Sequence, residues 1–286
     1  MIPMMNIVAW STKAPWAETR QVEQDLIISR ALLELFTDPM LATELRFRGG
    51  TALHKLHFPK PLRYSEDIDL VRSAAGPVGP ILDRIRQTLE PWLGMAAIDR
   101  TESATKLRFR TEAEDSSAEI KLKIEINTRE RQAFDPPQAI PYAVDNPWYA
   151  GRSNISTFSR EELLATKLRA LLQRQKGRDL LDLFQAFEAF EDLNAVRIVE
   201  CLGLYLERDG TPVSRAQAEQ RMFAKLAAPR FIADIRPLLS PAQAAKLTNE
   251  TIKHAFSVVF TRLIKAMPGE PWAKTPEKKK KFGIDV

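Results

Sequence analysis

The sequence contains little of the sulfur and imidazole chemistry on which several protein classes depend. Its 286 residues include one cysteine, Cys201, and three histidines. A single cysteine excludes an internal disulfide, and its position in the apolar segment 199–202 predicts a packed side chain rather than a nucleophile. His54 and His57 are three residues apart, but no cysteine accompanies them. We therefore expect packing or surface roles for them rather than zinc ligation.

Long apolar runs are also absent. No stretch approaches the roughly 18 apolar residues of a membrane span. The first residues contain no basic region ahead of a long apolar stretch, so we expect no secretion signal and a cytoplasmic protein without a membrane segment. The apolar fraction of 44% nevertheless excludes wholesale disorder. The length is sufficient for a large core and predicts two packed domains.

The net charge of +5 is small but unevenly distributed. From Arg221 to Val286 there are 13 Lys and Arg against five Asp and Glu, whereas the first 220 residues carry 29 against 32. A basic C-terminal region beside a nearly neutral remainder suggests a polyanion partner such as RNA. The alternative is a solubilising tail, and the charge count does not decide between them.

The stretch 47–70, FRGGTALHKLHFPKPLRYSEDIDL, organises the rest of the chain. Its end predicts a strand in which Asp67 and Asp69 alternate with apolar residues. The two carboxylates would then lie on one side of the strand, about 6.6 Å apart at Cα. Such a pair needs a cation, a shared proton or an arginine. Carboxylate oxygens suit Mg²⁺, and a pair of Mg²⁺ ions is the usual apparatus of nucleotidyl transfer.

Gly49 and Gly50 lie between a candidate strand, 45–48, and a candidate helix, 51–56. Glycine at such a corner lets the backbone approach a phosphate and present its N–H groups to the anion. Two glycines alone are common in plain turns, and two aspartates alone are usually a solvated surface pair. Their combination in this order is far more specific for phosphate chemistry.

Hydrophobic periodicity predicts helices over 16–36 and 77–93, and a strand over 106–111. The longest strict alternation, 118–127, predicts another strand, with Glu119, Lys121, Lys123 and Glu125 on its polar face. Glu125 has two interpretations. It is either an exposed strand glutamate or the third carboxylate of a metal site. Residues 131–159 are rich in proline, asparagine and aromatics and predict an extended connection between the halves, with room for one short strand.

The region after residue 159 is predicted to be helical. One helix carries Lys167 among leucines, and a second begins at Arg178 and places Asp179 and Asp182 on one face. Asp179 near a helix N-terminus is favourable in any protein, by about 0.3–1 kcal/mol. Further helices are expected over 193–206, 214–228, 229–239 and 240–267, followed by a flexible tail that contains Lys278–Lys281.

The motif RGGTALHKL…RYSEDIDL resembles that of the polymerase-β-type nucleotidyltransferases. Among them it is most similar to the AbiEii/AbiGii toxin family of bacterial toxin–antitoxin and abortive-infection systems. That family combines a Gly-Gly turn, an Arg-x-Ser-x-Asp-x-Asp strand, a further acidic strand and a lysine followed by an Arg-Asp-x-x-Asp-Leu helix. All four features occur here, between Leu45 and Phe184. The resemblance implies an α+β fold, with a nucleotidyltransferase core of mixed sheet and flanking helices over 1–155 and a helical domain with a basic tail over 156–286.

The resemblance also implies an activity. The chain would be a Mg²⁺-dependent toxin, with Mn²⁺ as an alternative ion, that transfers a nucleotide from an NTP to RNA, most plausibly tRNA. It would block translation or growth, serve in phage defence and have a cognate antitoxin. The implied metal ligands are Asp67, Asp69 and Glu125, which are also catalytic together with Lys167 and Asp179. The implied nucleotide-binding residues are Arg48, Gly49, Gly50, Thr51, Arg63, Ser65, Lys167, Arg178 and Asp182.

The sequence leaves other outcomes open. One alternative keeps the same fold but modifies a protein or a small molecule, and a non-catalytic nucleotide-binding regulator is a further alternative. Ser65 also has two interpretations. Some toxins of the family are thought to be silenced by phosphorylation at this position, because a phosphate would repel the triphosphate. Otherwise Ser65 is a serine that hydrogen-bonds within its turn.

Overall fold

The computed structural model describes residues 2–115, 118–228, 231 and 233–284. The chain divides into two compact units, Met1–Ser159 and Arg160–Val286. Within the described residues, no helix is both long enough and apolar enough to cross a membrane. Every strand in the described ranges belongs to the first unit, and the described part of the second unit is helical.

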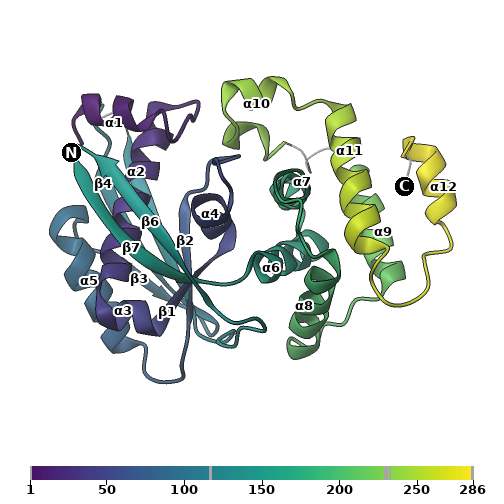
Figure 1. Ribbon diagram of the computed structural model, residues 1–286, viewed down its shortest axis with the longest axis horizontal. Coiled ribbons are helices and arrows are strands. Elements are labelled where there is room, and N and C mark those ends of the chain that lie inside the picture. The colour runs from purple at the N-terminus through teal and green to yellow at the C-terminus, as the bar shows by residue number, and fades with distance from the viewer. Residues whose placement is uncertain (1, 116–117, 229–230, 232, 285–286) are drawn as a thin grey trace. The chain divides into compact units, whose positions relative to one another are not determined.

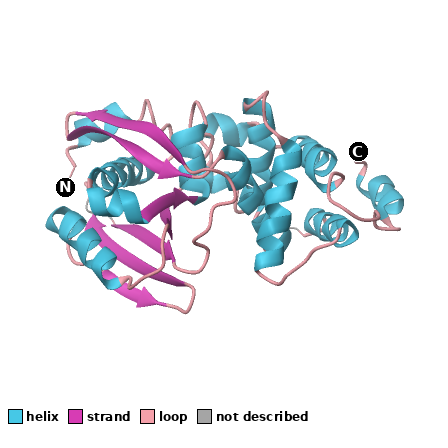
Figure 2. Cartoon of the chain, turned by 60° about the horizontal axis from the view of Figure 1, so that its bottom comes forward, coloured by secondary structure: helices cyan, strands magenta, loops and turns pink. Residues whose placement is uncertain are grey.

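The first unit is built on a seven-stranded sheet with strand order β3-β4-β5-β2-β1-β7-β6. Its strands are drawn in magenta in Figure 2. β2 runs antiparallel to β1 and parallel to β5, and β1 runs parallel to β7. The sheet is therefore mixed, which confirms the predicted α+β fold. The strands are β1 (Leu45–Arg48), β2 (Asp67–Arg72), β3 (Ala97–Arg100), β4 (Ala104–Glu112), β5 (Glu119–Asn127), β6 (Gln138–Asn146) and β7 (Tyr149–Thr157).

Helices cover the apolar face of this sheet. The predicted long helices are present as α2 and α5, and Figure 1 shows α2 lying behind β6 and β7. Leu26, Leu32 and Leu35 of α2 are fully buried, as are Ile68 and Ile124 of the central strands. Because side chains alternate along a strand, the residues on either side of these isoleucines lie on the opposite face. The helices are α1 (Met4–Trp10), α2 (Thr19–Thr37), α3 (Pro39–Glu44), α4 (Gly49–Ala52), the π-helical turn η1 (Leu53–His57) and α5 (Gly79–Leu93).

The extended connection predicted over 131–159 was wrong, because most of it forms the hairpin β6–β7. Local alternation is weak here, and Pro141 argues against a strand, but β6 is an edge strand, where proline is tolerated. β7 is fixed by a distant partner. It pairs with β1 at Phe47↔Thr157, and the Thr157 hydroxyl donates to the Phe47 carbonyl at 2.7 Å. The sequence of residues 131–159 alone therefore gives no sign of the pairing between β7 and β1.

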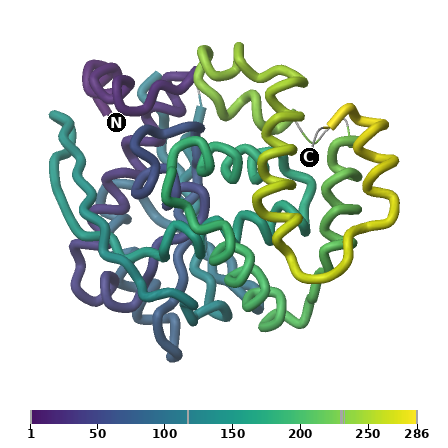
Figure 3. Tube along the Cα trace, turned by 45° about the vertical axis from the view of Figure 1, so that its right-hand side comes forward, coloured from purple at the N-terminus to yellow at the C-terminus, as the bar shows by residue number. Residues whose placement is uncertain are grey.

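The second unit consists of helices and short turns. They are α6 (Arg160–Gln173), α7 (Gly177–Ala189), α8 (Ala195–Arg208), α9 (Arg215–Leu226), the 3₁₀ turn η2 (Arg236–Leu238), α10 (Pro241–Ala245), α11 (Asn249–Val259), the π-helical turn η3 (Phe260–Ile264) and α12 (Thr275–Phe282). Figure 3 shows α12 beside α9. Phe223 of α9 stacks on Phe282 of α12, with ring centroids 6.2 Å apart.

Three predictions for the end of the chain need correction. The helix expected over 229–239 is only the short turn η2 among the described residues, and Pro229, Arg230 and Ile232 lie outside them. The long helix expected over 240–267 is interrupted, since Thr248 caps the start of α11 through a capping box with Thr251. The tail expected to be flexible forms α12, because its aromatic Phe282 packs on Phe223.

Candidate active site

The glycine corner and the aspartate strand lie against each other. β1 and β2 pair antiparallel with Arg48 opposite Asp69, so the turn after Arg48 reaches the Asp69 side chain. Gly49 has φ 85°, and a Cβ at this position would collide with Asp69 Oδ2. Only glycine combines this backbone with so close an approach. Gly50 follows as a buried residue of the first turn of α4.

The three predicted carboxylates come from neighbouring strands and lie on one face of the sheet. In the parallel pairing of β2 and β5, Asp69 lies opposite Glu125 and Asp67 lies opposite Lys123. Burial of the Asp69 carboxyl, with the nearby charge of Asp67, raises its pKa, although Arg48 and Lys123 oppose this shift. Burial therefore disfavours the ionised form of Asp69, and the positive charges of Arg48 and Lys123 offset this only in part.

Two ammonium groups lie among these carboxylates. Lys123 Nζ is 3.0 Å from Asp67 Oδ2 and 3.5 Å from Glu125 Oε2. Lys106 Nζ is 3.6 Å from Glu125 Oε2. The sequence alone predicts no role for either lysine. A signal was available for Lys123, since the alternation of β5 places it on the same face as Glu125.

The carboxylates are chemically suited to a divalent cation, because they are hard oxygen donors that lie on one face of the sheet. The Lys123 ammonium already places a positive charge between two of them, Asp67 and Glu125. In the part of the chain that the structure describes, however, no three His, Cys, Asp or Glu side chains gather closely enough to hold a metal ion. The metal site thus stays a prediction. Asp67 and Glu125 are each about one-third exposed, which leaves their oxygens accessible to an ion.

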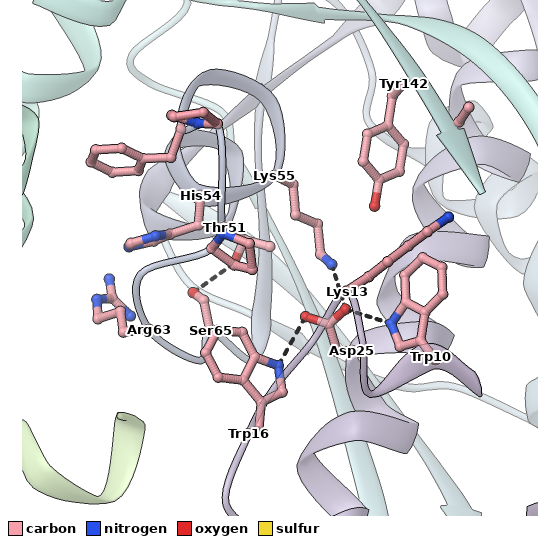
Figure 4. Close-up of a pocket in the computed structure, with 14 residues that line it drawn as sticks. Trp10, Lys13, Trp16, Asp25, Thr51, His54, Lys55, Arg63, Ser65 and Tyr142 are labelled. Atoms are coloured by element: carbon pink, nitrogen blue, oxygen red, sulfur yellow. Dashed lines mark hydrogen bonds and ion pairs between the residues drawn. The ribbon is translucent and has the colours of Figure 1, made fainter. Parts of the chain in front are cut away.

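Thr51 and Ser65 connect the glycine corner to the aspartate strand. The Thr51 hydroxyl donates to the Asp67 carbonyl at 2.5 Å and lies 2.8 Å from Ser65 Oγ. Both residues line a cavity of about 170 Å³ together with Arg63 and Trp16 (Figure 4). The Arg63 guanidinium is buried and donates to the Tyr64 carbonyl at 2.9 Å. Three of the predicted nucleotide-binding residues therefore share one cavity.

A polar network forms one wall of this cavity. Asp25 of α2 accepts hydrogen bonds from the indole N–H groups of Trp10 and Trp16 at 2.9 and 3.3 Å, and from Lys55 Nζ at 2.9 Å. Figure 4 shows these three donors converging on Asp25. Because Lys55 belongs to η1, the network fixes the segment after the glycine corner to α2. No local pattern in the sequence indicates this network.

Arg48 also has a partner that its local sequence does not indicate. Its guanidinium pairs with Glu130, just beyond β5. We predicted Arg48 as a cation for the triphosphate, and in this structure its charge is compensated by a carboxylate. The pairing joins residues that are far apart in the chain, so the residues around Arg48 give no sign of it.

The second unit contains a separate cluster of buried charges. Lys167 Nζ of α6 lies 3.0 Å from Asp182 Oδ2 and 3.6 Å from Asp179 Oδ1 of α7. Arg174 donates two hydrogen bonds to Asp179, at 2.7 and 2.8 Å. Both aspartates are fully buried. The structure therefore brings Lys167, Asp179 and Asp182 together, whereas Arg178 of the same motif is only partly buried.

Gly49→Ala is expected to lower nucleotidyl transfer at least about 100-fold, because the new methyl group displaces the Asp69 carboxylate and a misplacement of about 1 Å costs on this order. It should also destabilise the fold by roughly 1–2 kcal/mol through its positive φ. Gly94→Ala is the matched control, since Gly94 has φ 81° and no atom lies within 4 Å of its added Cβ. Equal transfer by the two variants would contradict the contact between the glycine corner and Asp69.

Comparisons with known proteins identify a family and a fold for this chain. A family model described as "Nucleotidyl transferase AbiEii toxin, Type IV TA system" matches residues 30–262. No curated protein matches the sequence. Among solved structures, MenT4, a nucleotidyltransferase toxin from Mycobacterium tuberculosis, is similar with a TM-score of 0.63 at 15% identity, over 91% of this chain and 99% of that one. JHP933 from Helicobacter pylori has a TM-score of 0.55 at 17% identity, over 93% and 97% of the two chains.

Proposed function

Since the chain belongs to the AbiEii family of nucleotidyltransferase toxins of type IV toxin–antitoxin systems, we propose that it transfers a nucleoside monophosphate from an NTP to RNA. The proposed reaction requires Mg²⁺, has a tRNA as its favoured acceptor, and blocks translation or growth in a phage-defence role. The family membership implies a cognate antitoxin as partner.

The observation that carries the proposal is the position of Asp67, Asp69 and Glu125 on one face, beside the Gly49 corner. Phosphoryl transfer depends mainly on positioning and charge neutralisation. A bound divalent cation would neutralise the triphosphate and activate the acceptor hydroxyl. The three carboxylates would hold this cation, and the N–H groups at Gly49 and Gly50 would donate hydrogen bonds to phosphate oxygens.

The cations of the chain have distinct proposed tasks. Lys167 would neutralise the leaving pyrophosphate, and Asp179 and Asp182 would orient its ammonium through the contacts described above. Arg63 and Ser65 would contact the nucleotide, since both line the same cavity as Thr51. Arg48 would have to exchange Glu130 for a phosphate before it could contribute.

An RNA acceptor is favoured over a small molecule by the basic C-terminal region. The 13 Lys and Arg against five Asp and Glu from residue 221 onward include the run Lys279–Lys281 in the last turn of α12. A helix surface with this charge attracts a phosphate backbone, and the attraction weakens as salt rises.

Incubation of the purified chain with Mg²⁺, bacterial RNA and each α-labelled NTP in turn tests the proposal. We expect label in a small RNA species for at least one NTP, and mass spectrometry of that RNA then identifies the added nucleotide. Label in protein alone would assign the same fold to another acceptor. Nucleotide binding without release of pyrophosphate would instead indicate a non-catalytic regulator.

A further inference from the structure

Lys123 occupies a central position among the carboxylates of the first unit. It lies two residues before Glu125 on β5 and directly opposite Asp67 on β2. Its ammonium reaches both neighbours, at 3.0 Å from Asp67 Oδ2 and 3.5 Å from Glu125 Oε2. Lys106, from β4, contacts Glu125 at 3.6 Å, and no ion pair joins it to Asp67 among the described residues. Lys123 is therefore the cation that bridges two of the three predicted ligands.

The surroundings of Lys123 are rich in negative charge. Asp67 and Glu125 lie within 3.5 Å of its ammonium, and Asp69 lies on the same face of β2 as Asp67. Without a cation, three carboxylates on two adjacent strands repel one another. The Lys123 ammonium compensates part of this repulsion.

We propose that Lys123 is a built-in counter-ion, which holds the empty site together and which an incoming divalent cation has to displace from between Asp67 and Glu125. The proposal rests on the proposed function, since it assigns these carboxylates to a metal ion. The lysine side chain is about one-third exposed, and its flexible four-carbon stem permits it to leave.

Displacement has a consequence for how the site is loaded. A free divalent cation competes with Lys123, so its affinity for the empty protein is weak. A cation that arrives with a triphosphate brings negative charge that Lys123 can contact after it leaves the carboxylates. The counter-ion thus favours loading by the metal–nucleotide complex over loading by the bare ion.

Titration of the intact purified chain with Mn²⁺, followed by electron paramagnetic resonance of the free ion, tests this directly. We expect Lys123→Gln to bind Mn²⁺ about tenfold more tightly than the wild type, because the ion no longer has to displace an ammonium from the carboxylates. The Coulomb energy of a close, partly buried ion pair is large enough that a small part of it accounts for a tenfold change in affinity. Lys123→Arg keeps the charge and should bind as weakly as the wild type. In the absence of metal, Lys123→Gln should melt at a lower temperature, and added Mg²⁺ should restore it.

Two other lysines provide matched controls. Lys121 lies on the same strand and the same face, opposite Arg110 on β4 and away from the three carboxylates, so Lys121→Gln should leave Mn²⁺ affinity unchanged. Lys106→Gln removes the ammonium that contacts Glu125 at 3.6 Å and should have an effect between those of the other two variants.

Unchanged or weaker Mn²⁺ binding by Lys123→Gln would overturn the counter-ion role, and so would equal tightening by Lys123→Arg. This outcome is distinguishable from failure of the proposed function. If the wild type labels RNA but Lys123→Gln does not tighten Mn²⁺ binding, only the counter-ion role fails. If Lys123→Gln tightens binding but the wild type transfers nothing, the transferase proposal fails and the counter-ion role stands.

Discussion

Asp69→Asn is expected to reduce nucleotidyl transfer at least about 10³-fold, because the amide cannot replace a carboxylate as ligand and charge partner of a divalent cation. Asp69 is the central candidate, since it contacts the glycine corner on one side and lies opposite Glu125 on the other. The measurement is incorporation of labelled nucleotide into RNA at saturating Mg²⁺. Asp99→Asn on the exposed edge strand β3 is the control, because its carboxylate pairs only with Arg108 among its described contacts, at 3.1 Å.

The same variant should be more stable than the wild type at neutral pH. The pKa of Asp69 is raised in the folded state by burial and by Asp67. The folded protein therefore binds this proton more tightly than the unfolded chain, and the associated stability is lost as pH rises through the folded-state pKa. Asparagine does not titrate, so the unfolding free energy of Asp69→Asn should not fall over the pH range in which Asp69 of the wild type loses its proton. A plot of unfolding free energy against pH measures this difference. Undiminished transfer by this variant would exclude Asp69 as a metal ligand.

Lys167→Met is expected to lower the free energy of unfolding by about 3–5 kcal/mol, because it removes the ammonium from two fully buried carboxylates. Arg174 would still pair with Asp179 through its two hydrogen bonds, so the larger cost falls on Asp182. Chemical denaturation followed by circular dichroism measures the loss. Lys176→Met, at an exposed position just before α7, is the control and should change stability by no more than about 0.5 kcal/mol.

A second substitution separates the structural role of Lys167 from its proposed catalytic role. Lys167→Met combined with Asp182→Asn removes the buried charge that the single variant leaves behind, so most of the stability should return. Nucleotidyl transfer should stay low, since no ammonium remains to meet the pyrophosphate. Recovery of both stability and transfer in the double variant would show that Lys167 acts only as a structural partner of the aspartates.

The elements that could be predicted from the sequence are those whose information is local. The alternation around β5 and the helical periodicity of α2 and α5 each lie within one segment, and all three elements are present. The hairpin β6–β7 could not be predicted in this way, because β7 depends on pairing with β1, about 110 residues away. The C-terminal helix α12 similarly depends on the contact of Phe282 with Phe223.

The same distinction applies to the candidate site. The residue types and local spacing of Gly49, Asp67 and Asp69 are sufficient to indicate phosphate and metal chemistry from the sequence. The two interpretations of Glu125 could not be resolved from β5 alone, since the pairing register of β2 with β5 decides which residue lies beside Asp69. The contacts of Lys123 with Asp67 and of Arg48 with Glu130 were missed for this reason, as both join residues that are far apart in the sequence.

The most direct test of the central claim is anomalous diffraction from crystals soaked with Mn²⁺ and a non-hydrolysable NTP. We predict a Mn²⁺ peak about 2.0–2.6 Å from carboxylate oxygens of Asp67 and Asp69, with the triphosphate beside Gly49. Bound nucleotide with no Mn²⁺ near these two aspartates, or with Mn²⁺ held only by other residues, would contradict the account.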